Sequence, residues 1–131
     1  KILEKYSGDE RILFAGAIFD QAAVHALRRY CKLYFHGHSV GGTNPSLLEA
    51  MASRALIAAH DNVFNRAVLQ EDAYYFKTAA EVMQLVNATG HSLLATAMRH
   101  NNLTKIKEQF SWPAIVDAYE IMMMQCYKNK Q

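Results

Sequence analysis

Apolar and polar positions follow one another along the chain in blocks that predict strands alternating with helices. Continuous apolar runs of strand length occupy residues 12–18, 33–35, 55–59 and 73–76. Apolar residues at helical spacing follow these runs, and helix-capping residues precede several of them: Asp20, Asn44, Thr78, Ser92 and Ser111. We therefore expect an α/β fold, a partial Rossmann-like parallel sheet of about four strands with flanking helices and further helices at the C-terminal end.

The stretch from Tyr34 to Ala52 reads as a strand, a glycine-rich loop and the start of a helix. Gly37, Gly41 and Gly42 give the loop a backbone that can approach a ligand closely. Asn44 and Pro45 together predict a helix start, because Asn favours the N-cap and Pro favours the first helical position. Leu47, Leu48 and Met51 then form the inward side of that helix.

This arrangement suits a nucleotide-sugar ligand. Free backbone N–H groups at a helix N-terminus attract phosphate and sugar oxygens. Glu49 lies three positions after Ser46, so its carboxylate shares a face with the helix start and can accept hydrogen bonds from a ribose diol. A simple strand-to-helix turn that carries a surface glutamate would have the same pattern, and that alternative stays open.

Composition narrows the class of protein. The chain has 131 residues, enough for one domain with a core, and a formal net charge of +2, too small to indicate nucleic acid binding. Its apolar runs fall well short of a membrane span, and Lys1 to Lys5 does not resemble a signal peptide. Cys31 and Cys126 lie far apart, which favours reduced thiols and a cytoplasmic protein.

The segment GGTNPSLLEAMA resembles the donor-binding signature of retaining glycosyltransferases of the GT-B fold, the glycosyltransferase group 1 or family 4 superfamily. The longer segment HGHSVGGTNPSLLEAMA is similar to its bacterial rhamnosyltransferase-type branch. RILFAGAIFD, HDNVFNRAVL and FSWPAIVDAYE agree, so the resemblance covers nearly the whole chain. It implies an enzyme that transfers a glycosyl group, with retention, from a nucleotide-sugar donor to a saccharide or lipid-linked acceptor.

The resemblance also implies roles for individual residues. Glu49 matches the glutamate that binds the donor ribose, whereas Gly41 stands where the superfamily has a second glutamate near the sugar. Backbone N–H groups of Gly42, Thr43 and Asn44 match positions that meet the sugar and the distal phosphate, and Ser46 can add its hydroxyl. For Thr43 and Asn44, loop formation and capping alone are the other interpretation.

Further residues are weaker candidates. Gly16, Ile18 and Phe19 match the turn that holds the nucleobase, although plain packing explains them equally well. Arg66 is a candidate phosphate ligand or a surface arginine, and His38 a candidate phosphate or sugar contact.

His36 and His38 could together chelate a metal, but no further ligand lies near them in sequence, and the resemblance implies no metal and no other cofactor for the chemistry. We therefore expect a structural or hydrogen-bonding role for this pair of histidines.

The resemblance starts inside the donor-binding domain. The acceptor domain and the first donor-domain strands, with their diphosphate-binding glycine-arginine turn and lysine, have no counterpart here. We therefore expect a fragment, the incomplete C-terminal half of a GT-B donor domain, that is inactive by itself. Its open sheet edges and the apolar last helix, with Met122, Met123 and Met124, predict homodimers, and the intact protein could attach peripherally to the inner membrane face.

Two other classes of protein are alternatives. The first is a non-catalytic nucleotide-binding or interaction module with a Rossmann-like half sheet. The second is part of a dinucleotide oxidoreductase, which ranks lower because no G-x-G-x-x-G turn follows a first strand.

Overall fold

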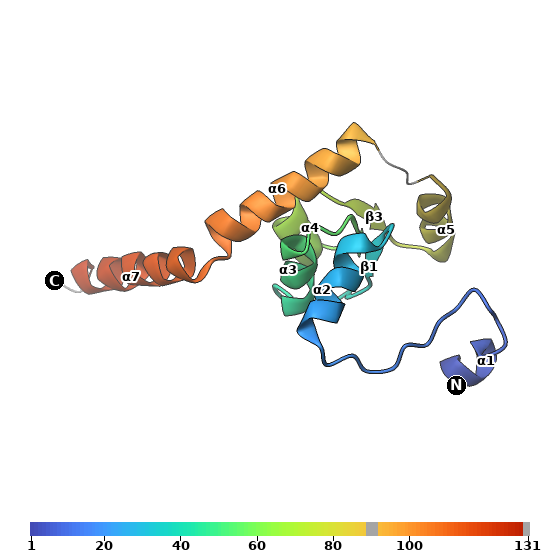
Figure 1. Ribbon diagram of the computed structural model, residues 1–131. Coiled ribbons are helices and arrows are strands. Elements are labelled where there is room, and N and C mark those ends of the chain that lie inside the picture. The colour runs from blue at the N-terminus through green and yellow to red at the C-terminus, as the bar shows by residue number, and fades with distance from the viewer. Residues whose placement is uncertain (89–91, 130–131) are drawn as a thin grey trace.

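A computed structural model of the chain describes residues 1–88 and 92–129 and has a mixed α/β fold (Figure 1). A three-stranded parallel sheet, in the order β1-β2-β3, lies at its centre with helices around it. The elements in chain order are α1 (Ile2–Tyr6), α2 (Gln21–Tyr30), β1 (Tyr34–His36), α3 (Pro45–Ala52), β2 (Ile57–His60), α4 (Val63–Leu69), β3 (Tyr74–Phe76), α5 (Ala79–Ala88), α6 (Leu93–Gln109) and α7 (Trp112–Lys128).

The middle strand β2 pairs in parallel with both neighbours. Phe35 of β1 lies opposite Ala58, and Ala59 lies opposite Tyr75 of β3. Ile57, Ala58 and Ala59 are fully buried, as the continuous apolar run predicts for a central parallel strand.

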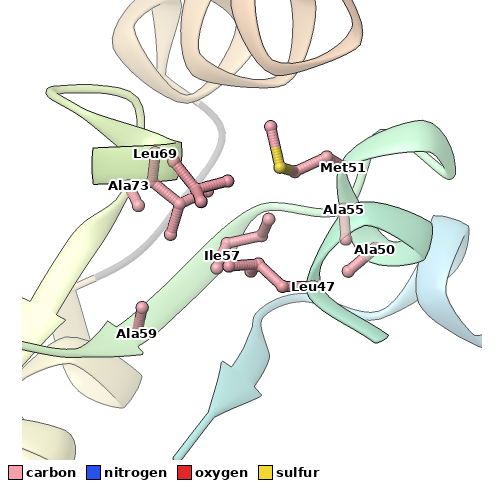
Figure 2. Packing of buried hydrophobic residues seen from close by; sticks show 9 residues of the cluster. Leu47, Ala50, Met51, Ala55, Ile57, Ala59, Leu69 and Ala73 are labelled. Atoms are coloured by element: carbon pink, nitrogen blue, oxygen red, sulfur yellow. The ribbon is translucent and has the colours of Figure 1, made fainter. Parts of the chain in front are cut away.

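The main core lies between β2, α3 and α4 (Figure 2). Leu47 and Met51 of α3 point at Ile57 of β2, and Leu69 at the end of α4 closes the same cluster. Their positions in α3 follow the helical spacing that the sequence predicts, so burial of this apolar face fixes α3 against the sheet.

Polar contacts join α6 to the segment between α4 and β3. Lys105 is buried, and its Nζ donates to the Leu69 carbonyl at 2.6 Å and pairs with Asp72 Oδ2 at 2.6 Å. Asn102 Nδ2 donates to the Asp72 carbonyl at 2.7 Å. These bonds satisfy a lysine that would otherwise be costly to bury.

Most predicted elements are confirmed. The caps at Asp20, Asn44, Ser92 and Ser111 each accept a bond from a backbone N–H in the first turn. The helix predicted over residues 92–101 continues to Gln109, and the last helix ends at Lys128 instead of Tyr127.

The predicted strand at residues 12–18 was wrong. Residues 12–20 form no regular structure and run beneath the sheet from α1 to α2 (Figure 1). No described strand pairs with this segment, and an apolar stretch forms a strand only when a neighbour satisfies its backbone groups. The sheet therefore has three strands and not four.

The last helix stands apart from the sheet. α7 has no buried residue and extends away from the other elements (Figure 1). Trp112, Tyr119 and Met122 to Met124 are all exposed. Among the described residues, no helix is both long and apolar enough to cross a membrane.

Candidate functional site

An open groove of about 530 Å³ lies where β1 ends and α3 begins. β1 and the loop after it contribute His36, His38 and Val40, and Ser46 of α3 closes the other side. Ligands of open parallel sheets bind at the carboxyl ends of the strands, which is where this groove lies.

Two asparagine side chains hold the loop that forms the groove. Asn62 and Asn65 donate from their Nδ2 atoms to the His38 carbonyl, at 2.9 and 3.0 Å. Asn65 is buried, and its Nδ2 also donates to the His60 carbonyl at 2.8 Å. The end of β1 is thereby tied to the end of β2, so the groove has a fixed wall.

The start of α3 keeps backbone donors free. The Asn44 side chain accepts from the Ser46 N–H at 2.9 Å and from the Ser46 hydroxyl at 2.7 Å. Within the described part of the chain, nothing accepts from the backbone N–H groups of Gly42, Thr43 and Asn44. Gly41 has φ +110°, a conformation that glycine adopts without strain because it has no Cβ atom, so the loop requires glycine at this position.

This cap changes what Ser46 can offer. Its hydroxyl proton is used in the bond to Asn44, so towards a ligand the Ser46 oxygen can only accept while that bond lasts.

His36 is the most unusual residue of the groove. It is 2 % exposed, and its Nε2 atom has no hydrogen-bond partner among the described residues. Its ring stacks on that of His38 with centroids 4.9 Å apart. Burial first, and the charge of His38 second, lower the pKa of His36 below its ordinary value, so the ring is held neutral.

Glu49 lies one turn further along α3. Its Oε2 pairs with Arg28 Nη2 of α2 at 2.7 Å, and its side chain is 48 % exposed. Glu49 does not line the groove, although Ser46, three residues earlier, does. No hydrogen bond among the described residues engages its Oε1, so one carboxylate oxygen remains open to a ligand.

Of the predicted site residues, only His38 and Ser46 line the groove; residues 41–44 lie between them in sequence but are not part of its lining. Gly16, Ile18 and Phe19 lie in the irregular segment before α2, where Phe19 is 88 % exposed. Arg66 donates to Asp61 and stacks over the Tyr75 ring at 4.1 Å, so its guanidinium already has partners.

A metal site is not assembled in the part of the chain that the structure describes. His36 and His38 stack on each other, and no group of three histidine, cysteine or acidic side chains surrounds them or any other point among these residues. Cys31 and Cys126 are free thiols.

Sequence reasoning missed two features of the groove. The first is the unpartnered Nε2 atom of His36. It is notable only because the residue is buried, and the short motif His-Gly-His does not predict burial. The role of Asn62 and Asn65 depends on the parallel pairing of β1 and β2, although their place directly after a buried strand is a signal that could have indicated it.

Comparisons with family models, with curated proteins and with solved structures give no match to this chain. The contacts and burial of its own residues are therefore the observations that bear on the role of the groove.

Proposed function

We propose that this chain is part of the donor-binding domain of a retaining glycosyltransferase, and that it holds the nucleotide-sugar at the mouth of α3. The observation that carries the proposal is that unused backbone donors at residues 42–44 precede the helix start next to the groove, while the buried His36 in the groove lining has an unpartnered Nε2 atom. Such donors suit the oxygens of a diphosphate and a sugar. In the intact enzyme, a glycosyl group would pass from this donor to a saccharide or lipid-linked acceptor.

Each residue has a defined task in this proposal. The N–H groups of Gly42, Thr43 and Asn44 bind the distal phosphate and the sugar. His36, neutral and able to donate or accept through Nε2, binds a sugar hydroxyl or a phosphate oxygen. Glu49 accepts hydrogen bonds from the ribose through the carboxylate oxygen that Arg28 leaves open, and Arg28 holds that carboxylate in place.

Calorimetric titration with UDP, dTDP and GDP tests the proposal. We expect one of these nucleotides to bind the chain, weakly, and Glu49→Ala to reduce its affinity about tenfold or more, because hydrogen bonds to a charged group contribute about 1.5–3 kcal/mol. Glu108→Ala is the matched control, since it removes an exposed helical glutamate far from the groove.

Two results would contradict the proposal in different ways. Equal affinities for the wild type and Glu49→Ala would remove the ribose role of Glu49. Absence of binding by all three nucleotides at millimolar concentration would remove the donor-binding role of this chain.

A further inference from the structure

A second hollow, which we call the arginine pocket, lies at the opposite end of α3. It has a volume of about 310 Å³ and is lined by Arg29, Arg54, Thr96, Arg99 and His100. Arg29 comes from the last turn of α2, Arg54 follows the end of α3, and the other three come from α6. α3 has eight residues and so separates this pocket from the groove by about 12 Å.

The arginines of this protein divide into two sets. The chain has six, and three of them, Arg11, Arg28 and Arg66, pair with carboxylates. The other three have no ion-pair partner within the described residues, and all three line the arginine pocket. No acidic residue lines the pocket, so three positive charges meet there without a counter-charge.

Arg99 carries the clearest sign of a missing partner. Its Nε atom is buried and has no hydrogen-bond acceptor among the described residues. A charged donor left in that state costs free energy, which an acceptor that reached it would recover. The neighbouring Cys31 does not supply that anion, because burial raises the pKa of its thiol above the ordinary value and keeps it protonated.

Helix ends account for only part of this charge. The carboxyl ends of α2 and α3 each carry a partial negative charge, which favours Arg29 and Arg54 at these places. Arg99 and His100 lie in the middle of α6, away from the termini of their own helix, and bring further positive charge to the same place. The clustering therefore points to a ligand that is itself anionic.

We propose that the arginine pocket binds a phosphate-bearing ligand. Guanidinium groups bind phosphate oxygens with two parallel hydrogen bonds, and three of them suit a doubly charged phosphate better than a singly charged carboxylate. The volume is at the lower limit of ligand pockets, which fits a phosphate monoester or a phospholipid head group and excludes a whole dinucleotide. The proposal does not depend on the function proposed for the groove.

Nuclear magnetic resonance with inorganic phosphate as the probe tests this site directly. Titration of phosphate into the ¹⁵N-labelled chain should shift the Arg99 Nε–H signal, and the signals of Arg29 and Arg54 with it, at concentrations that leave Arg11 unmoved. Arg99→Gln should weaken phosphate binding about tenfold or more, whereas Arg11→Gln, which removes the same charge elsewhere, should leave it unchanged.

Two further variants keep the proposal testable if Arg99→Gln does not fold. Arg29→Gln changes an exposed side chain and should also weaken binding. Arg99→Lys keeps the charge and loses the planar guanidinium, so intermediate binding is expected. Nucleotide binding at the groove should be unchanged in Arg29→Gln, which separates this proposal from the proposed function.

Vesicle sedimentation distinguishes the two sources of phosphate. Binding to vesicles of phosphatidylcholine with phosphatidic acid, and not to phosphatidylcholine alone, identifies a lipid head group if Arg29→Gln and Arg99→Gln abolish it. Binding of free phosphate without vesicle binding identifies a small phosphorylated ligand. The proposal is overturned if neither probe binds, or if Arg11→Gln weakens binding as much as Arg99→Gln.

Discussion

The two ends of α3 carry contrasting groups at the two places for which we propose anionic ligands. At its amino end, the groove has no arginine, lysine or carboxylate in its lining, which includes the His36 imidazole, and the unused backbone N–H groups of residues 42–44 lie beside it at the helix start. At its carboxyl end, the arginine pocket has three guanidinium groups. The helix dipole explains the difference, because a helix start is partially positive by itself, whereas a helix end is partially negative and attracts an anion only when formal charges outweigh it.

The comparison depends on the helix between the two sites staying in place. Leu47 and Met51 are almost completely buried against β2, and they are the reason that α3 positions both ends at once. Loss of this packing would therefore affect the groove and the arginine pocket together.

The largest effect is expected from Leu47→Ala. Removal of a fully buried leucine leaves a cavity, and we expect the free energy of unfolding to fall by about 2–5 kcal/mol. Urea denaturation measures this loss, and nucleotide and phosphate titrations should show both sites weakened together. Leu93→Ala is the matched control, because Leu93 is exposed and its removal should change stability by less than about 0.5 kcal/mol. Weakening of only one site would show that the two ends of α3 are not held by this packing.

We expect Asn65→Ala to cause a smaller loss of stability and to weaken binding only at the groove, at the amino end of α3. The buried Asn65 amide donates to the carbonyls of His38 and His60, and its removal leaves both without that donor. We expect a loss of about 1–3 kcal/mol of stability and weaker nucleotide binding, with phosphate binding unchanged. Asn101→Ala is the control: it removes an exposed asparagine of α6 whose Nδ2 donates to Asp72 at 2.8 Å and not to the groove, so nucleotide binding should be unchanged. Equal loss of phosphate binding in Asn65→Ala would mean that the groove and the arginine pocket are not independent.

The sequence predicts the region around α3 well and the region before α2 badly, for physical reasons. In residues 34–60, local signals all predict the same strand, loop and helix. These signals are an apolar run, glycines, the Asn44 cap, Pro45 and apolar residues at helical spacing. Residues 12–18 have the composition of a strand, but a strand also needs a neighbour along its edge, and composition does not tell whether one is present.

The two proposed binding places also differ in how well the sequence predicts them. The groove could be located from the sequence because one continuous segment builds most of it. The arginine pocket could not, because Arg29, Arg54 and Arg99 come from three separate elements that only the packing of α2 and α6 on α3 brings together. The ion pair between Glu49 and Arg28 could not be predicted from the sequence either, because it depends on how α2 packs on α3.

The smallest effect is a dependence of stability on pH that His36 of the groove contributes. Burial lowers the pKa of His36, so below the ordinary histidine pKa the unfolded chain takes up a proton that the folded chain does not. His36 therefore contributes stability that is fully present above about pH 6.5 and is lost as the pH falls through its folded pKa. The three guanidinium groups of the arginine pocket stay charged throughout this range, so they should add no such dependence.

Urea denaturation between pH 5 and pH 8 checks this difference. The free energy of unfolding should rise more steeply with pH in the wild type than in His36→Gln, which has no titratable group at that position. His38→Gln should keep most of the His36 contribution, because burial is the main cause of the lowered pKa and the stacked His38 ring only the second. Arg29→Gln should reproduce the wild-type profile. Parallel profiles for the wild type and His36→Gln would mean that the His36 imidazole is not held neutral, and the two ends of α3 would then differ less in charge than the structure indicates.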